Sequence, residues 1–375
     1  MELLILLFAI RIATDALPVN YGALPKIALV GPLADDEGSQ CGGYYHSGAS
    51  VVTVKTALEK QLGADRVLYS RGANPTDQNT SGIAKAVALA ASCDLTIVVV
   101  GDTTETCGEM FDRSNLDLPG GQLALLEAVA ATPTKTIVVL IHGRTVTFGR
   151  GNPVLAKVAG LFSAWRPGEE GGTAIVNLIG GVDGANPSGR LPQAWPRSVG
   201  GVQGPGAPYL YPFQGNHMGE TYATDGPSTP LFAFGSGLSY TSYVLSNLAI
   251  TPNATTAAGN FSARLIAQNT GTRDGDAIVQ VYFRDPVAFP VRIGSVQLVA
   301  YERVHVPAGS AVNVTVGIRA ADMAYWDDGS NGADARAPGW VVDPGAFQLV
   351  FGTAGFTSFA HPEGLRATVY VTAEG

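Results

Sequence analysis

The chain has 375 residues, of which 46% are hydrophobic and 14% charged, and its net charge at pH 7 is −8. This hydrophobic fraction is ample for buried cores and argues against a disordered chain, while the length suits two domains better than one. The acidic balance and the absence of a basic run argue against nucleic acid or an anionic membrane as a partner.

Residues 1–24 form an atypical N-terminal segment. Its apolar run from Met1 to Ile10 carries Glu2 where a signal peptide would carry a positive charge, and the run is too short to span a bilayer. We interpret it as a buried strand or the remnant of a longer chain. An extracellular or secretory location is nevertheless favoured by four Asn-x-Ser/Thr sequons. These sequons begin at Asn79, Asn253, Asn260 and Asn313.

Residues 25–199 alternate between short β-branched runs and helical stretches. The runs that predict strands are 26–31, 67–69, 95–101, 136–141 and 157–164. The stretches that predict helices are 51–62, 81–91, 122–131 and 172–179. Continuous apolar strands separated by helices are typical of a mostly parallel sheet with helices on both faces, so we expect an α/β sandwich domain. Functional residues of such sheets follow the carboxyl ends of the strands.

Residues 200–375 differ from the preceding part of the chain in composition and in hydrophobic pattern. Residues 200–243 are rich in Gly, Pro, Tyr and Gln without periodicity, which predicts a connector. Residues 244–375 contain short alternating runs separated by turn signals, which predict an antiparallel sandwich. The clearest of these runs are 261–267, 277–283, 312–318 and 347–351. Because the chain has no Cys-Trp-Cys framework, we expect an all-β fibronectin III-like domain.

Cysteine and histidine usage argues against a metal site. Cys41, Cys93 and Cys107 form no CxxC pair, and the five histidines are scattered singly. A disulfide between Cys41 and Cys107 is possible but cannot be deduced from their spacing. The odd number of cysteines leaves at least one thiol without an intramolecular partner.

The segment 108–122, GEMFDRSNLDLPGGQ, resembles the acid/base loop of family 3 glycoside hydrolases, the β-glucosidase and β-xylosidase group. Further segments are similar to the same family in the same order, and they cover nearly the whole chain from about Lys26. They are WRPGEEGGTA at 165–174, GANPSGRLP at 184–192, FAFGSGLSYT at 232–241, and the 269–271, 275–282 and 340–345 segments. The resemblance implies an α/β sandwich followed by a fibronectin III-like domain, and a reaction that needs no metal or organic cofactor.

The resemblance also implies the chemistry of a retaining glycosidase, which uses one carboxyl group as nucleophile and another as acid and then base. The family's nucleophile is an Asp in a Ser-Asp-Trp context on an N-terminal barrel, and this sequence contains no such tripeptide. The acid/base residue is a Glu on the loop. Glu109 matches the family's Glu-x-x-Asp-Arg spacing, whereas Glu105 lies in a Thr-Glu-Thr-x-Gly segment typical of other members. We favour Glu109 and keep Glu105 as the alternative.

Neighbouring polar residues have supporting roles in this interpretation. We expect Asp112 and Arg113 to brace the loop through a charge-assisted contact. His142 and Arg144 follow the predicted strand 136–141 and therefore share the sheet edge with the loop. They are candidates for binding substrate, but a packing role is favoured.

Two further groups favour structural interpretations. Glu169 and Glu170 lie between Pro-Gly and Gly-Gly pairs, which predicts a turn that caps the next helix. The four tryptophans could stack on sugars, but their spacing shows no platform, so packing is favoured. They are Trp165, Trp195, Trp326 and Trp340.

Together these features predict the C-terminal portion of an exo-acting β-glucosidase or β-xylosidase that acts on a β-linked oligosaccharide or aryl glycoside. We expect it to be inactive without a barrel domain, supplied upstream or in trans. The alternative is a non-catalytic carbohydrate-binding or scaffold protein. The choice between glucose and xylose stays open.

Overall fold

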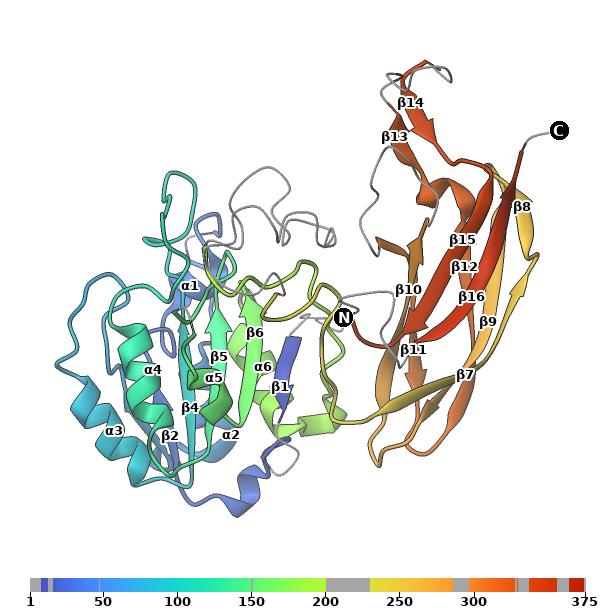
Figure 1. Ribbon diagram of the computed structural model, residues 1–375. Coiled ribbons are helices and arrows are strands. Elements are labelled where there is room, and N and C mark those ends of the chain that lie inside the picture. The colour runs from blue at the N-terminus through green and yellow to red at the C-terminus, as the bar shows by residue number, and fades with distance from the viewer. Residues whose placement is uncertain are drawn as a thin grey trace. The chain divides into compact units, whose positions relative to one another are not determined.

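The computed structural model describes residues 8–12, 16–46, 48–149, 151–199, 230–285, 297–327, 329, 337–355 and 364–373. The chain forms two compact units (Figure 1). The first comprises Met1–Gly189, Pro196–Gly200 and Gly237–Tyr240, and the second comprises Arg190–Trp195, Gly201–Ser236 and Thr241–Gly375. Residues 1–7 of the apolar run, and residues 200–229 of the expected connector, lie outside the described part of the chain.

The first unit is built on a six-stranded sheet with the order β1-β6-β5-β4-β2-β3. The strands are β1 Phe8–Ile12, β2 Ile27–Val30, β3 Val67–Ser70, β4 Leu95–Gly101, β5 Thr136–Ile141 and β6 Gly160–Trp165. Strands β2 to β6 pair in parallel, as their continuous apolar runs predict, and β1 adds antiparallel to the edge of β6. The expectation of a mostly parallel sheet is confirmed. Strand β6 begins at Gly160, later than predicted, because Lys157 ends a short helix.

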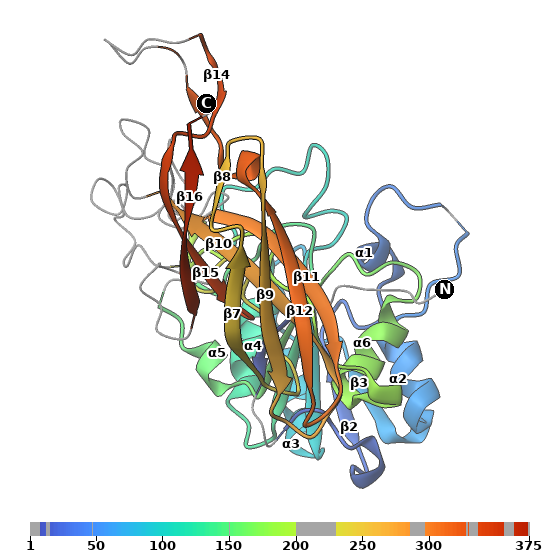
Figure 2. The same cartoon turned by 90° about the vertical axis from the view of Figure 1, so that its right-hand side faces the viewer.

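Helices cover both faces of this sheet (Figures 1 and 2). Helices α2 and α6 pack together on one face, and α3 and α4 pack together on the other. Helix α2 begins three residues later than predicted, because the Thr53 hydroxyl caps it by accepting a hydrogen bond from Thr56 N. The helices are α1 Glu37–Cys41, α2 Val54–Leu62, α3 Ile83–Ala91, α4 Gln122–Ala130, α5 Val154–Lys157 and α6 Gly171–Gly180, with short 3₁₀ turns at Tyr21–Ala23, Ala64–Arg66 and Val182–Gly184.

The second unit is a β-sandwich of two sheets, ordered β11-β10-β15-β16-β8 and β12-β9-β7. Its strands pair antiparallel except for β16 with β8, and the expected fibronectin III-like domain is confirmed. Alternate residues of β9 and β12, such as Phe261, Leu265 and Val316, point into one core. The strands are β7 Tyr243–Thr251, β8 Ala254–Thr256, β9 Asn260–Asn269, β10 Gly275–Arg284, β11 Gln297–Val306, β12 Ala311–Arg319, β15 Gly345–Gly352 and β16 Leu365–Thr372.

A 3₁₀ turn, Ala320–Met323, connects β12 to a separate two-stranded ribbon formed by β13 Tyr325–Asp327 and β14 Gly339–Val341. Trp326 and Trp340 are direct partners across this ribbon, with ring centroids 5.7 Å apart in an edge-to-face arrangement. Both rings are exposed, in contrast to the fully buried Trp195. The two tryptophans therefore pack against each other rather than in a core.

Close packing of α6 against the start of α2 depends on Gly172. A Cβ at this position would lie 2.2 Å from the carbonyl oxygen of Thr53. We expect Gly172→Ala to lower the free energy of unfolding of the first unit by about 1–3 kcal/mol, because the helix must shift to admit the methyl group. Urea unfolding followed by circular dichroism measures the change.

Gly43→Ala is the matched control, because a Cβ at Gly43 would meet no atom within 4 Å. Its unfolding midpoint is expected to stay close to that of the parent chain. Equal midpoints for the Gly172 variant and the control would show that the approach of α6 does not require glycine.

Candidate active site

Both candidate glutamates lie on residues 102–121, here called the glutamate loop, which connects the carboxyl end of β4 to α4. The buried Gln122 side chain joins the two ends of the loop: it accepts a hydrogen bond from Gly101 N (2.9 Å) and donates one to Gly101 O (2.8 Å). Gly101 has φ 143°, and a Cβ there would lie 1.8 Å from Ile141 O, so only glycine fits. The loop is thereby held at the edge where parallel sheets carry their sites.

A buried ion pair fixes the base of the glutamate loop. Asp102 follows β4 directly and is fully buried, and its Oδ1 accepts a hydrogen bond from Arg113 Nη1 at 2.8 Å. Arg113 also donates to the carbonyl oxygen of Asp117. The Asp117 carboxylate in turn accepts hydrogen bonds from Thr147 Oγ1 (2.5 Å) and Gly149 N (2.8 Å). Arg113 therefore connects the start of the loop to its end.

The ionic partner of Arg113 is thus Asp102 and not Asp112. Asp112 is exposed, and its side chain makes no hydrogen bond or ion pair with any residue that the structure describes. Burial raises the pKa of the Asp102 carboxyl, and the guanidinium groups of Arg113, Arg144 and Arg166 oppose that rise.

Two more arginines hold the loop through its backbone carbonyls. Arg166, directly after β6, donates from Nη1 to Asp102 O (3.0 Å) and Ser39 O, and from Nη2 to Thr103 O and Cys107 O (both 3.3 Å). Arg144 donates to Phe111 O (2.7 Å) and Thr106 O (3.4 Å). The structure therefore shows Arg144 as a loop contact, in keeping with the packing role that the sequence favoured, and its role in binding substrate stays a prediction.

Several buried polar atoms at this sheet edge have no hydrogen-bonding partner among the described residues. They are Gln40 Oε1, Asp102 Oδ2, Arg144 Nε and Trp165 Nε1. Their residues belong to α1 or follow or end strands β4, β5 and β6. Because buried polar atoms are normally paired, this edge has hydrogen-bonding capacity for water or for the hydroxyl groups of a ligand.

Glu109 lies at the exposed tip of the glutamate loop, where its Oε2 accepts a hydrogen bond from the hydroxyl of Tyr44. This contact is the reason why the pKa of the Tyr44 hydroxyl is raised. Glu105 is also exposed, and its backbone N donates to Thr103 Oγ1 at 3.1 Å. The side chain of Glu105 makes no hydrogen bond with the described residues, so of the two glutamates only Glu109 has its carboxylate held.

Exposed apolar side chains lie next to Glu109 and next to its partner Tyr44 in the chain. Tyr44 is 83% exposed and Met110 is 92% exposed, and Tyr45 and Phe111 are also exposed. Met110 has φ 67°, a left-handed conformation that is unfavourable for a non-glycine residue.

His142 lies in the interior and not at the surface. It is fully buried, its Nδ1 lies 2.7 Å from Arg144 O, and its Nε2 lies 2.8 Å from Ser163 Oγ. Its ring lies 4.5 Å from that of Trp165. Burial lowers the pKa of His142 to about 4, so the ring is neutral near pH 7. These contacts correspond to a packing role for His142. The ring follows β5 and contacts Ser163 of β6, so it connects the two strands.

All three cysteines are free thiols, including Cys41 and Cys107. Within the described ranges, no group of three or more His, Cys, Asp or Glu residues could hold a metal ion. No helix in the same ranges is long and apolar enough to cross a membrane.

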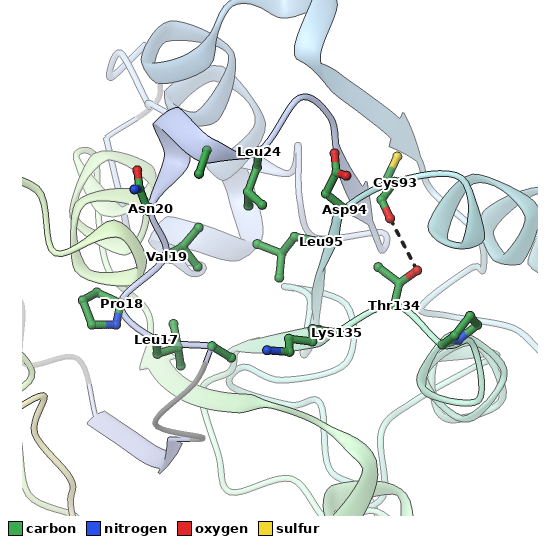
Figure 3. Close-up of a pocket in the computed structure, with 13 residues that line it drawn as sticks. Leu17, Pro18, Val19, Asn20, Leu24, Cys93, Asp94, Leu95, Thr134 and Lys135 are labelled. Atoms are coloured by element: carbon green, nitrogen blue, oxygen red, sulfur yellow. Dashed lines mark hydrogen bonds between the residues drawn. The ribbon is translucent and has the colours of Figure 1, made fainter.

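A cavity of about 640 Å³ lies at the opposite edge of the sheet, at the amino ends of β4 and β5 (Figure 3). Leu17, Val19 and Leu95 line it together with Asp94 and Lys135. Neither candidate glutamate borders this cavity. Since ligands of parallel sheets bind at the carboxyl ends of the strands, we assign the candidate active site to the glutamate loop.

Sequence reasoning missed Tyr44, Asp102 and Arg166. Asp102 and Arg166 directly follow β4 and β6, so the rule that sites follow strand ends could have identified both. No sequence signal identifies Tyr44, because it lies in the irregular segment after α1 and reaches Glu109 only through the fold.

The buried His142 makes stability depend on pH. Its pKa is about 4 in the folded chain and ~6.5 when unfolded, so between these values only the unfolded chain takes up a proton. The stabilisation is therefore complete above pH ~6.5 and is lost as pH falls towards 4, by on the order of 3 kcal/mol. Urea unfolding at a series of pH values measures this loss.

We expect His142→Asn to flatten this pH profile, because Asn has no group that titrates in the window. His46→Asn, at an exposed position, is the control and should keep the parent slope. A His142 variant with the parent slope would contradict the assignment of the slope to this ring.

Known family models match both units. The glycosyl hydrolase family 3 C-terminal domain matches residues 13–240, and the fibronectin type III-like domain matches residues 277–354. The chain is 30% identical over 351 residues to a β-xylosidase of Formosa agariphila, and 29% identical over 372 residues to a periplasmic β-glucosidase of Salmonella typhimurium. These alignments cover 91% and 90% of this chain, and 46% of each relative.

A solved structure gives the same result for the fold. A β-glucosidase involved in saponin metabolism from intestinal bacteria matches with a TM-score of 0.83 at 29% identity, over 98% of this chain and 53% of that one. The chain spans about half the length of the relatives it matches. It belongs to glycoside hydrolase family 3 and contains that family's C-terminal α/β domain followed by its fibronectin III-like domain.

Proposed function

We propose that this chain supplies the acid/base residue, Glu109, of a retaining β-glycosidase, and that a barrel domain supplies the nucleophilic carboxylate. The observation that supports the proposal most directly is that both the loop and the carboxylate of Glu109 are fixed in position. Its loop is fixed by Arg113, Arg144 and Arg166, and its own carboxylate is held by Tyr44. A general acid needs such a fixed position within reach of the leaving oxygen.

The proposed reaction has two steps. In the first, the Glu109 carboxyl gives its proton to the glycosidic oxygen as the bond from that oxygen to the anomeric carbon breaks, and the nucleophile bonds to the anomeric carbon. In the second, the Glu109 carboxylate takes a proton from water, whose oxygen displaces the nucleophile from the same carbon. The sugar leaves with retained configuration. Since Tyr44 occupies Oε2 of Glu109, Oε1 exchanges the proton.

A general acid must be protonated when the substrate is bound, and burial is one way to raise its pKa. The exposed side chains of Tyr44, Met110 and Phe111 beside Glu109 are suited to exclude water once a barrel domain and a sugar cover them.

The proposed substrates are β-linked oligosaccharides and aryl β-glycosides, in keeping with the β-xylosidase and β-glucosidase relatives. We also propose an extracellular or secretory location. In support, the asparagines of all four sequons are exposed, and an attached glycan requires an accessible side chain. They are Asn79, Asn253, Asn260 and Asn313.

The test joins the full chain to the N-terminal barrel of a family relative and measures hydrolysis of cellobiose, xylobiose and dinitrophenyl glycosides. We expect Glu109→Gln to lower kcat on the disaccharides by about 10²–10⁴-fold, because the poor leaving group needs protonation. The loss on dinitrophenyl glycosides should be smaller, and azide should restore part of it by replacing the water that needs a base.

Glu105→Gln is the matched control on the same loop and is expected to keep the parent kcat. A loss in the Glu105 variant, with full turnover in the Glu109 variant, would transfer the acid/base role to Glu105. A fusion whose nucleophile is intact, yet whose kcat is unchanged by either substitution, would refute the proposal and favour a non-catalytic carbohydrate-binding or scaffold protein.

A further inference from the structure

Arg166 lies where α1 and the glutamate loop meet, in the first unit. It directly follows β6, and its guanidinium donates hydrogen bonds to four backbone carbonyl groups. One belongs to α1, at Ser39, and three belong to the glutamate loop, at Asp102, Thr103 and Cys107. A guanidinium can serve carbonyls in several directions because its donors form a rigid fork. One side chain therefore ties α1 to the loop that carries Glu109.

The aliphatic part of Arg166 also contacts the end of α1. A Cβ at Gly42, the residue after the last helical residue, would lie 3.7 Å from Arg166 Cδ, so the backbone of Gly42 lies against this side chain. Tyr44 follows two residues later, and its hydroxyl donates to Glu109 Oε2. The short segment that carries Tyr44 thus begins at a point that Arg166 holds.

A buried glutamine joins α1 to the segment after β6 a second time. Gln40 is fully buried, and its Nε2 donates to Gly168 O (2.9 Å) and Val52 O (2.8 Å). In return, Gly168 N donates to Gln40 O at 3.1 Å. Since α1 has only five residues, it has little stability of its own. Its position therefore depends on contacts such as these and those of Arg166.

Close packing confines the guanidinium on the side of the loop. A Cβ at Gly143, two residues after β5, would lie 2.7 Å from Cys107 Sγ and 3.3 Å from both Nε and Nη2 of Arg166. The thiol and the guanidinium therefore occupy the space that the missing side chain of Gly143 leaves. Arg166 is enclosed between α1, the glutamate loop and the residues after β5.

We propose that Arg166 is a positioning residue for the acid/base step, because it holds α1, and with it Tyr44, in a fixed place relative to Glu109. This inference rests on the proposed function of Glu109. Among the described residues, the guanidinium groups of Arg113 and Arg144 donate only to the glutamate loop. Of these three arginines, Arg166 alone joins the loop to α1.

The three cysteines can report on this junction in the full chain, because all are free and partly buried. Cys41 ends α1, Cys107 lies in the glutamate loop, and Cys93 precedes β4 at the opposite edge of the sheet. The test measures the rate at which each thiol reacts with iodoacetamide, by peptide mass spectrometry. We expect Arg166→Lys to raise the rates of Cys41 and Cys107 by about five- to thirtyfold, the range for loss of one or two hydrogen bonds. Cys93 should keep its parent rate.

Arg144→Lys is the matched control, since Arg144 bonds Thr106 O beside Cys107 but makes no hydrogen bond to α1 among the described residues. It should raise the rate of Cys107 and leave that of Cys41 unchanged. An unchanged rate of Cys41 in Arg166→Lys would overturn the proposal. Equal acceleration of all three thiols would also overturn it, because the whole unit would then be loosened rather than α1 released.

The catalytic consequence is measured in the barrel fusion. Arg166→Lys should lower kcat on cellobiose by about 10- to 100-fold, the scale expected for a displacement of about 1 Å, and should lower it less on dinitrophenyl glycosides. In a Glu109→Gln background the same substitution should have little further effect, because both changes act on one step.

The two proposals fail in different ways. Parent-like kcat in Arg166→Lys, beside a large loss in Glu109→Gln, would overturn the positioning role alone. Full kcat in Glu109→Gln would instead refute the proposed function, and the thiol rates would separately show whether Arg166 holds α1.

Discussion

The buried Asp102 carboxylate, with its guanidinium partner, is the constraint on which the candidate site depends. A charge at the end of a central strand would be costly without a partner, and Arg113 supplies that partner from the far end of the same loop. The ion pair therefore joins two distant parts of the glutamate loop, and it also neutralises the charge of Asp102 at the end of β4. Gln122 joins the two ends of the loop by bonding both backbone groups of Gly101.

The backbone carbonyl groups of the glutamate loop also need hydrogen-bonding partners. Carbonyl groups in an irregular segment have no strand or helix partner, so other groups must satisfy them. Arg144 and Arg166 meet this need for Phe111, Cys107 and Thr103. One guanidinium can serve several carbonyls because its donors form a rigid fork. The result is a long loop that keeps its shape at the sheet edge while Glu109 stays exposed.

The fold could be predicted from the sequence because its signals are local. Runs such as 95–101 and 136–141 are continuously apolar, and they form β4 and β5 with every residue buried. The alternation of apolar and more polar residues in β9 likewise indicates a strand with one buried face. The start of α2 was less predictable, since the apolar pattern continues through Val51 and Val52 until the Thr53 cap.

The site could be predicted only in part, because its contacts join residues that are distant in the chain. The loop and its glutamates have a local motif, but Tyr44 reaches Glu109 across 65 positions and Arg166 reaches Asp102 across 64. His142 shows the opposite difficulty. Its position after a strand is typical of a site residue, yet its two ring nitrogens bond Arg144 O and Ser163 Oγ inside the core. Strand ends thus predict where a site lies, and tertiary contacts decide which side chains face it.

A loop held entirely by its own domain suits a reaction whose two carboxyl groups lie on different domains. The acid/base residue must keep its position before the other domain is present, since the two carboxyl groups of a retaining site are only ~5–5.5 Å apart. The contacts of Asp102, Arg113 and Arg166 provide this order without any partner. The position of Glu109 is therefore determined by contacts within this chain, which extend from the buried Asp102 to Tyr44.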